Sequence, residues 1–397
     1  MHTFASRLLM YDLTRDPLWL GLDAFAQGVS TVLLPWGGVL ADRFDRKTIL
    51  VIGNVLAAVN VAALAASSYF GVLDKWHILA ISFANGAINA AIVPANQSLV
   101  PSIVGKVNLT SALALNSMQF NLSRVLGPVL AAVAYKALGA HWCFAINSAS
   151  FLVLVAVLLS IRVKPRRPRQ HEPALTALAS GWRYIRGRPD LMLIIALVGA
   201  GAFLSAPAMS MAPALVLDVY FGSGDEVASL IACVGGGAVV GAYVLAVHGH
   251  EPKPWRTFGT LLTLGVAQLA LGYAGDIADV ARLKDAQYLF ALAFMFVMGM
   301  MMVGSMVRLG SALQHGTPDA YRGRVLSFQQ LAFRASQPLG SLVAGASASV
   351  APFPGVLWPF RVFGAVLIGV VIALWLVRRA GNITYQLVAE ETDELEE

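Results

Sequence analysis

Two arginines stand deep inside long apolar stretches of the chain, where a charge is costly. Arg124 and Arg334 each lie about ten residues, roughly 15 Å at the helical rise, inside such a stretch. An arginine near a bilayer centre costs about 2.5 to 3.5 kcal/mol on insertion scales, so each must face protein or water. Such a pair would suit an anionic ligand. Alternatively, each arginine satisfies helix carbonyls freed near Pro128 or Pro338, or pairs with a carboxylate.

Amide side chains accompany the arginines. Those on the same two segments are Asn116, Gln119 and Gln329. On an earlier segment, Asn89 shares a helical face with Asn85 and Asn96, at spacings of four and seven residues. We predict that these amides line a cavity together with the arginines. The asparagines could equally well bond to neighbouring helices.

A proton-carrying carboxylate is scarce in this chain. Of the 22 acidic residues, only Asp23 stands clearly within an apolar run, near one end of it. Asp23 is therefore the candidate for coupling a proton to a conformational change. The alternative is an interfacial side chain that bonds to water.

The elements that would position these residues are membrane helices. The chain has 397 residues, of which 57% are hydrophobic and 13% charged, against about 25% charged in a soluble domain. The apolar residues fall in blocks of about 20, the length that crosses a bilayer as a helix. The composition therefore predicts an all-α, polytopic membrane protein. The two cysteines, Cys143 and Cys233, lie inside such blocks and are expected to be free thiols.

The predicted order of helices divides the chain into two bundles. The expected spans are 18–40, 48–70, 77–99, 109–136 and 141–162, and then 190–217, 226–248, 256–275, 286–308, 323–349 and 355–378. We therefore expect an N-terminal bundle over residues 1–162, a linker over 163–189, a C-terminal bundle over 190–378 and an acidic tail over 379–397. Residues 1–17 are too short and too polar to span by themselves.

A charged turn joins the first two predicted spans. It holds Asp42, Arg43, Asp45, Arg46 and Lys47 in six residues. Counted over the whole chain, alternate loops on the side of this turn carry nineteen Lys and Arg residues, and those on the other side carry five. This bias predicts that the turn, the linker and the C-terminus are cytoplasmic.

The linker contains a stretch of amphipathic pattern. Leu175, Leu178, Trp182 and Ile185 recur at helical spacing beside Arg183 and Arg186. We predict a helix on the inner membrane surface that is held by anionic lipids. The alternative is a solvated connector.

An internal repeat relates the two bundles. Gln119, Arg124 and Pro128 recur as Gln329, Arg334 and Pro338, at an offset of 210 residues. The matched triplets lie in corresponding helices of the two halves, which is typical of transporters built from repeats.

Motifs of other protein classes do not occur. The chain has no G-x4-G-K-[ST] phosphate loop and no H-E-x-x-H zinc pair. We therefore expect neither an enzyme nor a cofactor nor a metal. The net charge of +6 comes from membrane-flanking loops, so nucleic acid is not an expected partner.

The segment from Gly37 to Lys47 resembles the signature between helices 2 and 3 of the major facilitator superfamily. With Asp45 at its position, this segment resembles the branch of the superfamily that exports siderophores and drugs. Pro94 to Gln97, and Arg322 to Arg324, resemble the same branch. This resemblance implies two bundles of six helices. It also implies that Tyr11 to Thr14 end helix 1, so most of helix 1 is missing through a misassigned start or a truncation.

The resemblance also assigns roles to residues. Asp42 would accept hydrogen bonds from the start of helix 11 near Gly323, next to Arg324, and so latch the cytoplasmic side shut. Arg43 and Arg46 would hold Asp42 and Asp45 in place. The alternative is that this charged cluster only fixes the topology.

A second resemblance lies in the helix that carries Arg124. Gly127 and Pro128 resemble the centre of the antiporter motif of superfamily exporters, and would permit a kink and close helix packing. Ala131 and Ala132 stand where paired glycines are common, which is a departure from that motif.

These observations predict a monomeric secondary transporter of the bacterial inner membrane. It would export a siderophore or a similar amphiphilic small molecule by alternating access, with protons as the antiported ion by resemblance. One alternative is a multidrug or macrolide efflux pump. Another is a carrier that no longer transports and serves as a scaffold or sensor.

Overall fold

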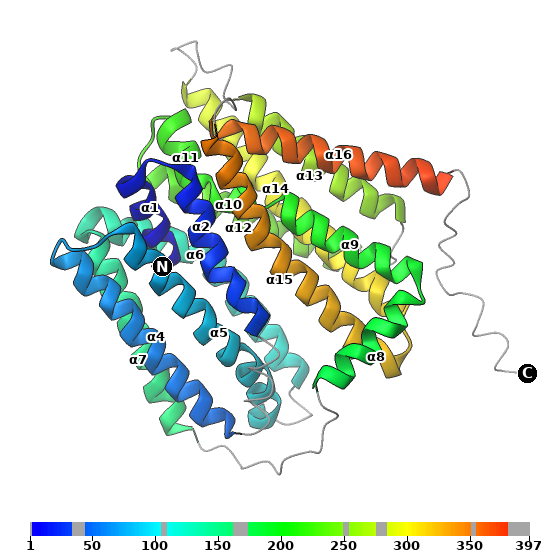
Figure 1. The fold of residues 1–397 in the computed structure, drawn as a ribbon, viewed down its shortest axis with the longest axis horizontal. Coiled ribbons are helices and arrows are strands. Elements are labelled where there is room, and N and C mark those ends of the chain that lie inside the picture. The colour runs from blue at the N-terminus through cyan, green and yellow to red at the C-terminus, as the bar shows by residue number, and fades with distance from the viewer. Residues whose placement is uncertain are drawn as a thin grey trace, which may run out of the picture.

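The computed structural model describes residues 2–33, 44–104, 109–161, 174–248, 254–274, 284–350 and 355–379. These residues form helices and connecting turns, with no strand among them. Eight of the helices are long and apolar enough to cross a membrane. The fold is therefore an all-α, multi-pass membrane architecture (Figure 1).

The N-terminal half begins with two short helices that meet at a tight turn. They are α1 (His2–Thr14) and α2 (Pro17–Val29), and α2 continues as a 3-10 turn, η1 (Ser30–Leu33). Arg15 adopts a positive φ of 49° between them, and the Asp16 carboxylate caps α2 by accepting from Leu18 N at 2.9 Å. The segment before the turn is thus helical, and it is buried at Phe4, Leu8 and Tyr11 among others.

Four long helices complete the N-terminal half. They are α4 (Arg46–Tyr69), α5 (Lys75–Val104), α6 (Leu109–Leu138) and α7 (Ala140–Ser160), each within a few residues of a predicted span. Helices α4 and α7 lie side by side, and the buried Ser148 hydroxyl on α7 donates to the Ala58 carbonyl on α4 at 2.8 Å.

The described part of the C-terminal half contains six long helices. They are α9 (Pro189–Leu204), α12 (Gly224–His248), α13 (Pro254–Ala274), α14 (Lys284–His315), α15 (Asp319–Ser349) and α16 (Leu357–Arg379). Small residues allow α12 and α14 to approach closely. A Cβ at Gly237 would overlap the Phe296 carbonyl, and one at Gly241 would lie 2.5 Å from the Met300 carbonyl oxygen.

The span predicted over 190–217 is found as a candidate span over Pro189–Ser210, but its regular helix is interrupted after α9. Two very short helices, α10 (Pro207–Ser210) and α11 (Ala212–Ala214), lead into a π-helical turn, η2 (Leu215–Val219). Pro207 and Pro213 have no N–H, so the helical bonds to the carbonyls four residues earlier cannot form. We call Ser205–Val219 the broken segment.

The linker helix packs on protein. Helix α8 (Ala174–Arg186) lies against the start of α15. Tyr184 stacks on Tyr321 with ring centroids 4.3 Å apart, and Ile185 is fully buried. The amphipathic helix is therefore present, and the alternative of a solvated connector does not fit residues 174–186. Residues 162–173 lie outside the described part of the chain.

The two halves meet along two pairs of helices, α2 with α15 and α6 with α12. The two helices that carry the sequence repeat, α6 and α15, thus each pack against a helix of the opposite half. Figure 1 shows α2 and α15 running side by side through the middle of the molecule. We call the end where α2 begins and α15 ends the upper end, and the end where α4 begins and α8 lies the lower end.

Candidate functional site

Polar side chains join the two halves at the upper end. The Tyr11 hydroxyl donates to Asp218 of η2, and the Ser349 hydroxyl donates to Asp16. The backbone N–H of Leu18 also donates to Ser349 Oγ, at 2.9 Å. We call this set, with the pair described next, the polar closure.

An ion pair extends the polar closure to the second interface between the halves. Lys136, at the end of α6, pairs with Asp225 in the first turn of α12. Their side chains are 75% and 42% exposed, so water screens the attraction between them. This pair therefore adds little stability by itself and serves to align the two helix ends.

A buried ion pair lies one layer deeper. Asp23 on α2 has a side chain only 1% exposed, and its Oδ2 lies 3.7 Å from Arg7 Nε on α1. Its other oxygen accepts a hydrogen bond from the buried Ser82 hydroxyl on α5, at 2.5 Å. Removing both charged groups from water is expensive, so each depends on the other for compensation.

Arg7 also reaches the C-terminal half. Its Nη1 donates to the carbonyl of Met209, at 3.2 Å. That carbonyl would bond to residue 213 in a regular helix, but Pro213 has no N–H to donate. The broken segment therefore supplies the acceptor that links the buried Arg7–Asp23 pair to the other half.

Helices α2 and α15 pack closely below the polar closure. A Cβ at Gly21 would lie 2.6 Å from the Ser341 carbonyl oxygen, and one at Gly345 would lie 2.7 Å from the Pro17 carbonyl oxygen. Further along, a Cβ at Gly28 would overlap the ring of Pro338. The upper part of the α2–α15 interface therefore has no room for water or a ligand in this conformation.

The predicted latch at the lower end is only partly described. Asp42 and Arg43 lie outside the described residues. The Asp45 carboxylate caps α4, because it accepts from Thr48 N and Thr48 Oγ1 at 2.9 Å each. Arg324 lies over the Tyr321 ring at 5.6 Å, and its Cβ is close to Gly181 of α8.

The predicted cavity residues are spread over several helices. Arg334 is half-buried on α15, and Gln329, one helical turn or so earlier, is 4% exposed with its amide close to Gly310 of α14. Gln329 thus faces a helix of its own half. Gln119 is exposed on α6, and Asn89 donates to the Asn85 carbonyl at 2.9 Å within α5.

Other cavity predictions fall on side chains that are not described. Those of Arg124, Asn116 and Pro128 in α6 lie outside the described set. Gly127 can be assessed: a Cβ there would meet nothing within 4 Å. No atom of the described residues lies against that position, and the kink and close packing expected at Gly127 and Pro128 stay a prediction.

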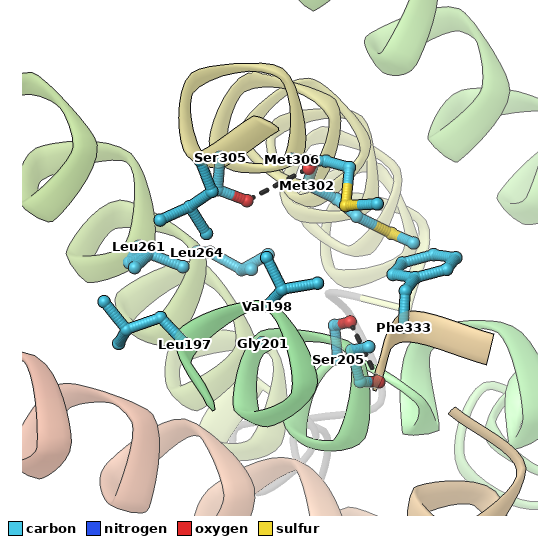
Figure 2. Close-up of a pocket in the computed structure, with 12 residues that line it drawn as sticks. Leu197, Val198, Gly201, Ser205, Leu261, Leu264, Met302, Ser305, Met306 and Phe333 are labelled. Carbon is cyan, nitrogen blue, oxygen red and sulfur yellow. Dashed lines mark hydrogen bonds between the residues drawn. The ribbon is translucent and has the colours of Figure 1, made fainter. Parts of the chain in front are cut away.

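A cavity inside the C-terminal half is too small for a substrate. It lies between α9, α13, α14 and α15, with Val198, Met302, Met306 and Phe333 among its walls, and has a volume of ≈ 20 Å³. That volume holds about one water molecule. Figure 2 shows the hydroxyls of Ser205 and Ser305 bonded back to carbonyls of their own helices, so neither points a free polar group into the space.

The structure corrects the interpretation of Asp23 as interfacial. Its carboxylate is buried among protein groups and does not lie at the water boundary. Arg7 was not identified from the sequence, because residues 1–17 were judged too short and too polar to span the membrane. The signal that could have found it was the presence of one buried carboxylate, which requires a cation. No group of residues suited to a metal ion occurs within the described ranges.

Two helical halves that meet along the long helix pairs α2–α15 and α6–α12 form the fold of a transporter of the major facilitator type. Solved structures with this fold include the nucleoside transporter NupG, with a TM-score of 0.67, 13% identity, and 94% of this chain and 97% of that chain covered. A bacterial homologue of the human lysosomal transporter Spinster, inward-facing and occupied, gives a TM-score of 0.69 at 13% identity, over 95% and 93% of the two chains.

The chain belongs to the family described as transmembrane secretion effector, whose model matches residues 1–387. Among curated proteins it is similar to the enterobactin exporter EntS of Shigella boydii serotype 18 (strain CDC 3083-94 / BS512). The two are 26% identical over 368 residues, which cover 92% of this chain and 85% of the exporter. The enterobactin exporter EntS of Escherichia coli O127:H6 (strain E2348/69 / EPEC) is 26% identical over the same shares.

Proposed function

We propose that the protein exports a siderophore, or an anionic amphiphile of similar kind, from the cytoplasm. The observation that carries the proposal is the similarity to proteins named enterobactin exporter over 92% of the chain. The membership in a family described as secretion effectors points in the same direction. For the alternative, a multidrug efflux pump, no described residue provides specific support.

Transport would proceed by alternating access. The distribution of Lys and Arg assigns the lower end to the cytoplasm and the upper end to the outside. The conformation with the polar closure intact is then the one closed to the outside. Opening it would require the loss of the Arg7–Met209 and Tyr11–Asp218 bonds together with separation of α2 from α15.

The substrate would meet positive charge near the middle of the membrane. Arg334 is half-buried in α15, and Arg124 is its counterpart in the sequence repeat on α6. Because both helices belong to the interface between the halves, a site between them would change its accessibility when the halves rock. A siderophore with ionisable catechol or carboxylate groups suits this charge.

Proton antiport would use Asp23. The carboxylate is buried and compensated by Arg7 while the upper end is closed. Protonation would leave Arg7 as an uncompensated buried charge, and opening of the upper end would then hydrate it. The outward-open state would accordingly be the one that takes up the proton as substrate leaves.

Complementation tests the proposal. The chain is expressed in an Escherichia coli strain that lacks its enterobactin exporter, and enterobactin is measured in the medium and in the cells under iron starvation. We expect the medium content to rise and the cell content to fall relative to the empty vector. A chain present in the membrane at normal amount with no change in either pool would refute siderophore export. A protection from toxic drugs in the same strain would then favour multidrug efflux.

A further inference from the structure

Two arginines meet on adjacent helices at the lower end of the C-terminal half. A Cβ at Gly304 of α14 would lie 3.5 Å from Thr260 Cγ2 of α13, so these two positions face each other. The helices are consecutive and antiparallel. Arg308 lies about one turn beyond Gly304, and Arg256 about one turn before Thr260, so the two arginines lie level on the facing sides.

Among the described residues, neither arginine has a counter-charge. No carboxylate in the described part of the chain forms an ion pair with either of them. Arg308 Nε is buried and makes no hydrogen bond to any group in the described part of the chain. Arg256 makes a cation–π contact with the ring of Trp255, at 5.2 Å, which orients it without neutralising it. Two like charges held close together, beside a buried donor that bonds to no described group, would be stabilised by an anion.

The surroundings indicate where the anion comes from. Trp255, beside Arg256, is 64% exposed, and Val307, beside Arg308, is 47% exposed. Val266, eleven residues after Trp255 and therefore on the same face of α13, is 51% exposed. An apolar outer surface that ends in an exposed tryptophan and a pair of arginines has the profile of a membrane–water interface.

We propose that Arg256 and Arg308 form a binding site for the phosphate of an anionic phospholipid in the cytoplasmic leaflet. The guanidinium groups bind phosphate oxygens through paired N–H donors, and the acyl chains lie along the apolar surface above them. The site is separate from the interface between the two halves, and it does not depend on which substrate the protein transports. A soluble phosphate has the same headgroup chemistry but makes no use of the apolar surface.

Thermal unfolding of the purified, delipidated full chain tests the site. Dioleoyl phosphatidylglycerol, dioleoyl phosphatidylcholine and glycerol 3-phosphate are each added to the protein in detergent. The variants are Arg256→Gln and Arg308→Gln, with Arg308→Lys as the conservative change. Arg322→Gln is the matched control, because it removes one exposed positive charge from the same end of the molecule.

We expect phosphatidylglycerol to raise the Tm of the natural chain and of Arg322→Gln by at least about 2 °C more than phosphatidylcholine does. This difference should vanish in Arg256→Gln and Arg308→Gln and persist in part in Arg308→Lys. Equal shifts in all chains, or equal shifts with the two lipids, would overturn the site. A full shift with glycerol 3-phosphate alone would overturn the lipid as its occupant. If Arg308→Gln does not fold, the difference between the two lipids measured on Arg256→Gln decides whether the site exists.

Discussion

Neutralising Asp23 should open the upper end of the protein. Asp23→Asn keeps the shape of the side chain and an oxygen that can accept from Ser82, but it leaves Arg7 without a counter-charge. Arg7 has a side chain only 16% exposed. Breaking a buried pair by removal of one partner costs about 3 to 5 kcal/mol, and partial access to water places this case at about 3 kcal/mol.

That cost falls on the closed conformation. Opening lets water reach Arg7, so the equilibrium between closed and open should shift by roughly 150-fold for about 3 kcal/mol. Ser341 reports on this change, because it is 3% exposed and its backbone carbonyl lies against Gly21 across the α2–α15 interface. The assay is the rate at which a maleimide labels Ser341→Cys in a chain whose two natural cysteines are replaced by alanine.

We expect Asp23→Asn to raise the labelling rate by one to two orders of magnitude, about the shift in the open population. The matched control replaces both partners with apolar residues, Arg7→Leu with Asp23→Leu. Removing both charges leaves no unpaired buried charge, and only the neutral Ser82 hydroxyl and Met209 carbonyl lose a partner, so most of the increase should disappear. An unchanged rate in Asp23→Asn, with normal insertion into the membrane, would refute the reasoning. Equal rates in the single and the double variant would do so as well.

Three further changes test other parts of the molecule. Asp42→Asn should reduce export, measured as substrate in the medium, severalfold while membrane insertion stays normal. Unchanged export would contradict the role of Asp42 in a cytoplasmic latch. Arg124→Ala should lower transport of anionic substrates more than that of cationic ones, and equal losses would assign Arg124 a structural role. Asp225→Asn should change the free energy of unfolding by less than about 1 kcal/mol, since its pair with Lys136 is exposed; a larger loss in thermal or denaturant unfolding would show that water does not screen the pair.

The helices were predictable because hydrophobic blocks of membrane length leave few choices. The spans that became α4, α7, α12 and α16 begin and end within about two residues of the predicted bounds. The break after Leu204 was missed, although Pro207 and Pro213 are visible in the sequence. Proline is tolerated in membrane helices where neighbours bond the freed carbonyls, so its presence alone does not place a break. Here Gln268 donates to the Leu204 carbonyl at 2.8 Å and Arg7 to that of Met209.

The site was less predictable than the helices. Asp23 stood out in the sequence as a charge within an apolar run, and its role in proton coupling stays a prediction. Its partner, Arg7, lies in a segment of mixed polarity, where no sequence pattern distinguishes it. Tyr11, Asp218, Lys136 and Asp225 lie at helix ends, where polar residues are ordinary. Their pairing across the two halves depends on tertiary arrangement, which a single sequence does not reveal. The roles expected of Arg124 and Arg334 remain predictions.

The most direct test of the central proposal is enterobactin transport by this chain in inverted membrane vesicles. The vesicles are energised to give a proton gradient, and uptake of labelled enterobactin is followed over time. Because the cytoplasmic face points outward, we predict accumulation that exceeds that of vesicles carrying the empty vector, and that collapses when the gradient is dissipated. Uptake equal to the empty vector, with the protein present at normal amount, would contradict export of this class of substrate.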